Sequence, residues 1–90
     1  MSGNKSRVSP GRARKAVRDV LKFQEGDPLA EEPMLDAVNE LVGGGVDLTQ
    51  LRAALEWNHG EAYVATEYID ELELKGWVIT KAGINHDRIK

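Results

Sequence analysis

The chain has 90 residues, a net charge of −3 and a hydrophobic fraction of 41%, which suits one small domain with a limited core. It contains no cysteine, so disulfides, thiolate metal sites and cysteine nucleophiles are excluded. No apolar run reaches the ~20 residues of a membrane span, and the polar, basic N-terminus lacks the apolar core of a signal peptide, so we expect a cytoplasmic protein.

The charges are divided unevenly along the chain. Residues 1–22 contain seven basic residues and one acidic residue, whereas residues 23–74 contain thirteen acidic residues and one basic residue. Residues 75–90 contain four basic residues and one acidic residue. The chain therefore has two basic ends and an acidic middle, a pattern that says more about partners than the net charge does.

The first part of the chain predicts an arm followed by a basic helix. Residues 1–9 are polar and lack periodicity, which is typical of a flexible basic arm. Ser9 and Pro10 are residue types favoured at an N-cap and at the first position of a helix. Apolar residues then recur at helical spacing among arginines and lysines, which predicts a basic amphipathic helix over residues 10–24.

Two more helices are predicted in the acidic middle. Turn-forming residues at 25–32 interrupt the first helix, and Pro33 suits the first turn of a second helix. The three glycines at 43–45 end that second helix. Asp47 and Gln50 fit a capping box, which predicts a third helix that ends near Trp57.

The last part of the chain predicts a fourth helix and a short hairpin. Four residues share one helical face, which predicts a helix over about residues 61–75: Ala65, Ile69, Leu72 and Gly76. Residues 77–80 favour a strand and are followed by a turn. Residues 84–90 either return as the second strand of a hairpin or fray.

Two segments carry a resemblance to winged helix-turn-helix domains. IDELELKGWVITKAG, from Ile69 to Gly83, resembles the end of a recognition helix and the strand that follows it. DLTQLRAAL, from Asp47 to Leu55, is similar to the preceding helix. In this pattern Leu72 fills the core, Gly76 allows the abrupt exit from the helix, and Val78 re-enters the core.

The resemblance implies a mostly α fold. A winged helix-turn-helix domain would cover residues 33–90, with an additional N-terminal basic helix and a short C-terminal β-hairpin. The resemblance is weakly specific for function, because winged helices also serve as protein-docking modules. Two hypotheses about function therefore follow.

The first hypothesis is a small DNA-binding protein, a transcription or replication regulator that contacts double-stranded DNA. The resemblance implies that the start of the 61–75 helix enters the major groove. That helix is acidic and phosphates would repel it, so the positive charge has to come from the basic N-terminal helix and arm and from the wing. The residues expected to contact nucleic acid are Arg7, Arg12, Arg14, Lys15, Arg18, Tyr63, Thr66, Glu67 and Lys81.

The second hypothesis is a non-catalytic docking module. Its acidic surface, residues 56–73, would bind a basic protein partner or mimic DNA. We also expect a homodimer, with Val17, Val20 and Leu21 of the basic helix at the interface.

An enzyme is not indicated by the sequence. His59 and His86 are isolated, and the glycines at 43–45 follow a helix and are not followed by the Gly-Lys-Ser/Thr of a phosphate loop. We therefore expect no catalytic residue, no metal and no cofactor.

Overall fold

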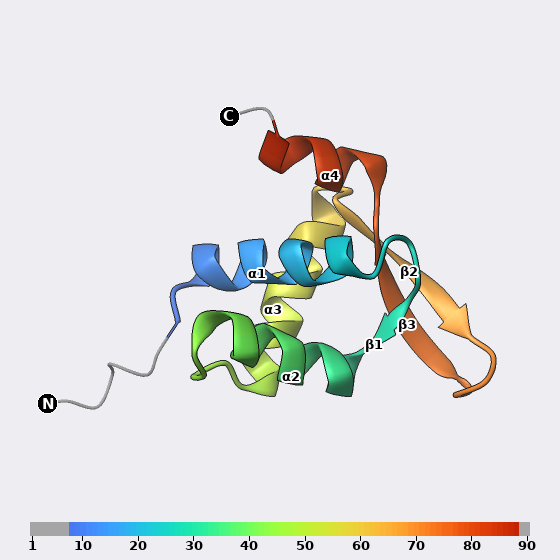
Figure 1. Cartoon of the computed structure of the whole chain (residues 1–90), viewed down its shortest axis with the longest axis horizontal. Helices are drawn as coiled ribbons and strands as arrows, with labels where there is room; N and C mark the ends of the chain where they lie inside the picture. Colours follow the sequence, from blue (N-terminus) through green and yellow to red (C-terminus); the bar gives the residue numbers. More distant parts are fainter. Residues whose placement is uncertain (1–7, 89–90) are drawn as a thin grey trace, which may run out of the picture.

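The computed structural model describes residues 8–88, which form three packed helices, a small sheet at one end and a further helix (Figure 1). The elements in chain order are α1 (Pro10–Phe23), β1 (Leu29–Ala30), α2 (Glu31–Val42), α3 (Leu48–Gly60), β2 (Val64–Ile69), β3 (Leu74–Ile79) and α4 (Lys81–Arg88). The strands pair antiparallel in the order β1–β3–β2. Three helices followed by a β2–β3 wing make a winged helix, so the predicted fold class is confirmed.

Local signals in the sequence place the first three helices. Ser9 Oγ accepts a hydrogen bond of 3.2 Å from the backbone N–H of Arg12 and caps α1. Asp47 Oδ1 accepts from the Gln50 N–H at 2.8 Å, and Gln50 Oε1 accepts from the Asp47 N–H at 3.4 Å, which completes the capping box of α3. The three predicted helices are confirmed, with small differences at their ends. The two caps begin α1 and α3, whereas α2 has no side-chain cap at its start and ends at Gly43 in the left-handed conformation.

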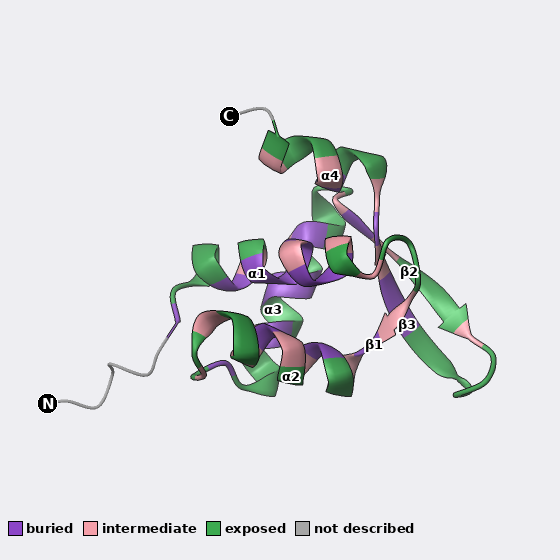
Figure 2. Ribbon diagram, viewed as in Figure 1, coloured by how far each residue is buried: buried purple, intermediate pink, exposed green. Residues whose placement is uncertain are grey.

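One hydrophobic core joins the helices to the sheet (Figure 2). Its fully buried apolar side chains come from α1, α2, α3 and β2 and are Val17, Leu21, Met34, Val38, Leu51, Leu55 and Val64. The sequence analysis places Val17, Val20 and Leu21 at a dimer interface, but the structure buries all three inside one chain. Because α1 packs against both α2 and α3, these side chains cannot reach a partner.

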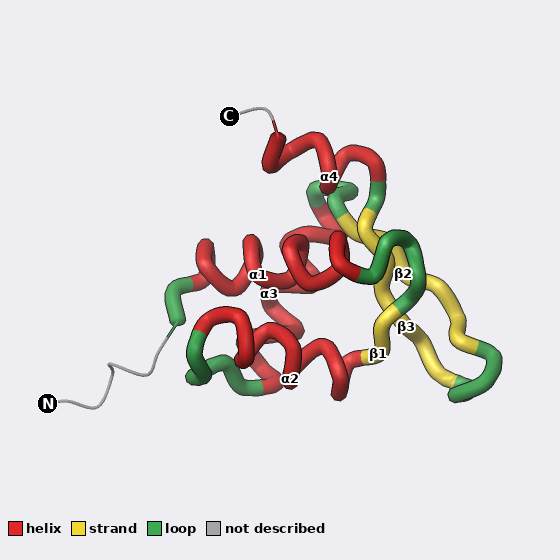
Figure 3. The backbone as a smooth tube through the Cα atoms, viewed as in Figure 1, coloured by secondary structure: helices red, strands yellow, loops and turns green. Residues whose placement is uncertain are grey.

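The helix predicted over residues 61–75 is wrong. These residues form β2, a tight turn and the first residues of β3 (Figure 3). Positive φ angles at Ala62 (65°) and Glu73 (57°) bend the backbone just before β2 and just before β3, which a continuous helix does not allow. The β-branched and aromatic residues of β2 favour a strand, and they are Val64, Thr66, Tyr68 and Ile69.

Gly76 is a buried strand residue and not a helix cap. A Cβ atom added there would lie 2.5 Å from Ile69 Cδ1 and 3.1 Å from Pro28 Cβ. The missing side chain therefore lets Ile69 and Pro28 close over the middle of β3.

The predicted second strand after residue 84 is also wrong, because residues 81–88 form α4. Thr80 Oγ1 accepts from the Gly83 N–H at 3.0 Å and donates to the Ala62 carbonyl at 2.7 Å, which links the start of α4 to the residues before β2. Gly83 is buried against the Tyr63 carbonyl, where an added Cβ would collide.

We expect Gly83→Ala to destabilise the protein by ~1–3 kcal/mol, the usual cost of overpacking, because backbone cannot move aside as a flexible side chain can. Gly11→Ala is the matched control, since Gly11 is also helical and an added Cβ there meets no atom within 4 Å. Thermal unfolding followed by circular dichroism measures both variants. An unchanged Tm for Gly83→Ala would contradict the close packing of α4 on Tyr63.

Candidate interaction face

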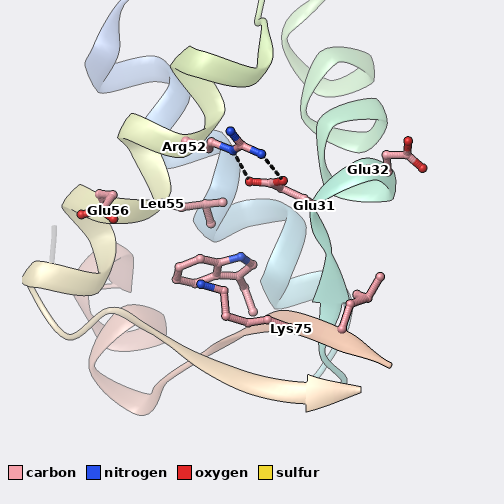
Figure 4. A pocket seen from close by; sticks show the side chains of 8 residues that line it. Glu31, Glu32, Arg52, Leu55, Glu56 and Lys75 are labelled. Atoms are coloured by element: carbon pink, nitrogen blue, oxygen red, sulfur yellow. Dashed lines mark hydrogen bonds and ion pairs between the residues drawn. The ribbon is translucent and has the colours of Figure 1, made fainter. Parts of the chain in front are cut away.

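An open groove of about 570 Å³ lies between the start of α2, the side of α3 and the strand β3 (Figure 4). We call its lining the groove face. The lining residues are Glu31, Glu32, Arg52, Leu55, Glu56, Leu74, Lys75 and Trp77. In DNA-reading helix-turn-helix domains the second helix of the motif, here α3, lies in the major groove. The groove face includes one side of this helix, at Arg52, Leu55 and Glu56.

Arg52 and Glu31 form a two-pronged ion pair across the groove. The Nε and terminal NH2 groups of Arg52 donate to the two carboxylate oxygens of Glu31 at 2.7 and 3.1 Å (Figure 4). The hydrogen bond from Arg52 lowers the pKa of the Glu31 carboxyl below its ordinary value and outweighs the opposing effect of partial burial. Glu31 is therefore ionised at neutral pH and already has a cation beside it.

The second cation of the groove face also has a contact within the chain. The Nζ of Lys75 lies 4.9 Å from the ring centre of Trp77, within the range of a cation–π interaction. Among residues 8–88, the ion pairs of the structure include neither Glu32 nor Glu56, although both carboxylates border the groove. The rim of the groove therefore keeps negative charge that its own cations do not pair.

The wing adds more acids next to the groove. Four exposed carboxylates lie on β2 and on the turn before β3, and they are Glu67, Asp70, Glu71 and Glu73. Exposed apolar and aromatic side chains accompany them at Tyr68 and Leu72. The groove face and the wing together hold seven carboxylates and two cations, Arg52 and Lys75.

Cations of α1 are largely engaged within the chain. Lys15 Nζ lies 2.9 Å from Asp19 Oδ2, and Lys22 Nζ lies 3.1 Å from Asp87 Oδ2. The guanidinium carbon of Arg14 lies 4.6 Å from the ring centre of Trp57. These contacts leave Lys15 mostly exposed, so it can also meet solvent ions, whereas Lys22 and Arg14 are half-buried.

Arg18 is buried and serves as a structural link. Its side chain donates to both carboxylate oxygens of Asp87, at 3.0 and 3.1 Å, and to Asn58 Oδ1 at 3.0 Å. Only 6% of the residue is exposed. A phosphate cannot reach this buried side chain, so the phosphate contact predicted for Arg18 is wrong.

The other described residues that were expected to contact DNA lie on several elements, and none of them belongs to α3. Tyr63 precedes β2 and stacks on His86 with ring centres 4.4 Å apart. Thr66 and Glu67 are exposed on β2, and Lys81 is the exposed first residue of α4, not a wing residue. Arg12 is exposed near the start of α1, and Arg7 lies outside the described residues.

Sequence reasoning missed the residues that build the groove face. Arg52 is the one basic residue among residues 23–74, and this is the signal by which the sequence could have drawn attention to it. The partner, Glu31, lies 21 residues away, and spacing along the chain does not reveal it. The sequence analysis predicts Lys75 at the end of a helix and Trp77 in the following strand, and neither prediction shows that the two side chains lie beside α3.

Within residues 8–88 there is no group of three or more His, Cys, Asp or Glu side chains placed to hold a metal ion. Every helix in the same part of the chain is too short or too polar to cross a membrane.

Asp87 gives the structure a pH-dependent element. Partial burial opposes ionisation of its carboxyl, but hydrogen bonds and positive charge from Arg18 and Lys22 outweigh burial and lower the pKa of Asp87 from 3.8 to about 2. Because the pKa is lower in the folded state, the ion pair stabilises the fold above about pH 4, and this stabilisation is lost as the pH falls towards 2.

We expect Asp87→Asn to lower the free energy of unfolding at pH 7 by ~1–2 kcal/mol, since it removes the charge opposite a buried arginine. Urea unfolding of both proteins between pH 7 and pH 3 measures the difference, which should be constant above about pH 4 and shrink below it. A difference that does not change with pH would show that the Asp87 charge does not act in this way.

Comparisons with known proteins support the fold. No protein-family model matches the sequence, and no curated protein matches it. Among solved structures, a transcriptional regulator of the MarR family from Silicibacter pomeroyi is similar, with a TM-score of 0.68 and 20% sequence identity. The similar region covers 86% of this chain and 47% of that regulator, so the chain spans about half of its length. This likeness shows that the chain has the winged-helix fold of that regulator.

Proposed function

We propose that the chain is a non-catalytic winged-helix docking module that binds a basic segment of a protein partner on its groove face. The observation that carries the proposal is the charge of the groove face and the wing taken together, which hold seven carboxylates, three on the groove face and four on the wing, against two cations. Both cations already have intramolecular contacts, Arg52 with Glu31 and Lys75 with Trp77.

Duplex DNA is a poor ligand for such a face. A protein gains most of its affinity for DNA by neutralising phosphates with lysine and arginine, which releases counterions. Carboxylates give no such gain, and two like charges ~4 Å apart repel by about 1 kcal/mol even in water. The four wing acids alone would therefore oppose the approach of a phosphate backbone to α3.

A basic peptide, unlike DNA, would be attracted by the carboxylates of this face. Lysine and arginine side chains have apolar stems that pack on apolar surface while their charged ends remain near water. The groove offers such a surface mainly at Leu74, beside the buried Trp77, with the carboxylates of Glu32 and Glu56 along its border. Charge complementarity of this kind gives specificity and fast association.

We expect a fluorescein-labelled peptide rich in lysine and arginine to bind the protein, and the affinity to fall with added salt because the charges are screened. Glu32→Lys/Glu56→Lys should weaken this binding by about tenfold or more, since it reverses both carboxylates that lack an ion-pair partner within residues 8–88. Fluorescence anisotropy measures the dissociation constants.

The matched control is Glu25→Lys/Glu61→Lys, which changes the net charge equally at two exposed positions that do not line the groove. If both double variants weaken binding to the same extent, the peptide responds to net charge alone and the groove proposal is wrong.

A second candidate function is DNA binding, favoured by the likeness to a transcriptional regulator. Here the exposed cations Arg12, Lys15 and Lys81 would contact phosphates together with Arg14 and Arg7, and Tyr63, Thr66 and Glu67 would approach bases. Apart from Arg7, which is outside the described residues, these residues lie on α1, β2 and α4 and just before β2, and not on α3.

Titration of a random duplex at two salt concentrations separates the two functions. The docking proposal predicts no measurable binding of the duplex at low salt under conditions in which the basic peptide binds. Duplex binding that weakens steeply with salt and is lost in Arg12→Ala/Lys15→Ala would instead establish the DNA function and overturn the docking proposal.

A further inference from the structure

The edge of the sheet along β2 is open. The strand order β1–β3–β2 makes β2 an edge strand, and the hairpin of β2 and β3 extends beyond the helices with β2 on its outer side (Figure 1). β2 has six residues, pairs with β3 in an unbroken register and contains no proline, lysine or arginine. Natural edge strands are usually kept from pairing by shortness, by bulges, or by proline or lysine, so β2 lacks the common forms of protection.

The backbone groups of Thr66 and Tyr68 point out of this open edge. The Thr80 N–H donates to the Tyr63 carbonyl at 3.0 Å, so these two residues form a hydrogen-bonded pair that continues the antiparallel ladder of β2 and β3. Hydrogen-bonded pairs alternate with non-bonded pairs along such a ladder, so Thr66 and Tyr68 turn their N–H and carbonyl groups away from β3. The turn, loop and cap hydrogen bonds among residues 8–88 do not include these groups, and both residues are exposed. Another strand can therefore pair with them.

The side chains along this edge differ between the two faces of the sheet. Thr66 lies opposite Trp77 of β3. Tyr68 lies opposite Lys75, so all four of these side chains share one face, on which Tyr68 is 62% exposed. Glu67 points to the other face, because side chains alternate along a strand, and it is the one charged residue of β2. An added strand would therefore meet an aromatic ring on one face and a carboxylate on the other.

We propose that β2 binds an extended segment of a partner protein as an additional antiparallel strand, in which lysine or arginine alternates with apolar residues. A cation of the segment lies opposite Glu67, and its apolar residues pack beside Tyr68. The turn after β2 adds the carboxylates of Asp70, Glu71 and Glu73. In strand addition the backbone hydrogen bonds give affinity and the alternate side chains give specificity. No residue of β2 lines the groove, so this site does not depend on the docking function proposed above.

A second copy of the chain is a poorer occupant of this edge. Residues 61–73 contain five acidic residues and no lysine or arginine. Pairing of two β2 edges would therefore bring carboxylates together without a cation between them, and like charges on neighbouring strands destabilise their pairing. The acidic wing disfavours self-association through β2 while it attracts a basic strand.

Methylation of backbone amides in a peptide tests the pairing with the unaltered protein. The probe is a fluorescein-labelled peptide in which lysine alternates with valine, and fluorescence anisotropy measures its dissociation constant. In an antiparallel pair with β2, the residues opposite Thr66 and Tyr68 turn their N–H groups towards β2, whereas the residue opposite Glu67 turns its N–H away. With lysine opposite Glu67, N-methylation of the valine residues should abolish binding, and N-methylation of the lysine residues should leave the dissociation constant unchanged.

The variant Thr66→Pro tests the same contact from the side of the protein. Proline removes an N–H that faces outwards, which is where an edge strand tolerates it, so β2 should still pair with β3. We expect Thr66→Pro to raise the dissociation constant of the peptide about tenfold or more. Thr66→Ala is the matched control, because it keeps the N–H, and it should bind as the unaltered protein does. Circular dichroism verifies that both variants are folded.

Peptide binding that responds equally to methylation of the valine and the lysine residues would overturn the proposal, since a strand pairs through one set of amides. Binding that survives Thr66→Pro but is lost in Glu32→Lys/Glu56→Lys would place the peptide in the groove, which overturns strand addition and supports the docking function. A doubling of mass in light scattering that Thr66→Pro removes would assign the edge to a second copy and also overturn the proposal.

Discussion

The buried amide of Asn58 is the interaction on which the arrangement of the helices depends. Its Nδ2 donates to the carbonyls of Ala54 in α3 and Arg14 in α1, at 2.9 and 3.1 Å, while its Oδ1 accepts from Arg18. Arg18 in turn holds Asp87 of α4. A polar group without access to water has to be satisfied by the protein, so this network requires α1, α3 and α4 to meet in one geometry.

The sequence was sufficient to predict those elements that are determined by residues close together along the chain. The capped starts of α1 and α3 could be predicted because Ser9 and Asp47 act on residues three positions ahead. The helix predicted over residues 61–75 was wrong because their apolar spacing fits a helix, whereas the pairing of β2 with β3 that makes them strands does not show in that spacing. Of the candidate site, the acidity of the groove and wing was visible in the sequence, but the partners of Arg18 and Arg52, 69 and 21 residues away, were not.

The fold of this chain suits DNA binding, whereas the charge of its surface does not. The architecture is that of a winged helix, whose exposed third helix and wing suit contact with a polyanion, yet most of the charged residues exposed there are carboxylates. The sequence analysis expects basic residues of the N-terminal helix to supply the missing positive charge. Several of these side chains instead contact Asp19, Asp87 and Trp57 within the chain. The same scaffold can thus present an electrostatic field of opposite sign without a change in its core.

The ion pair between Arg52 and Glu31 has a consequence for any partner that enters the groove. A cationic side chain of the partner has to displace the Arg52 guanidinium before it can bind Glu31. The new ion pair then replaces an existing one, so its full interaction energy is not gained. A lysine ammonium is a single point charge and cannot reproduce the two parallel hydrogen bonds that are broken, whereas a second arginine can. The groove would thereby discriminate between two side chains that carry the same charge, by the shape of the cation alone.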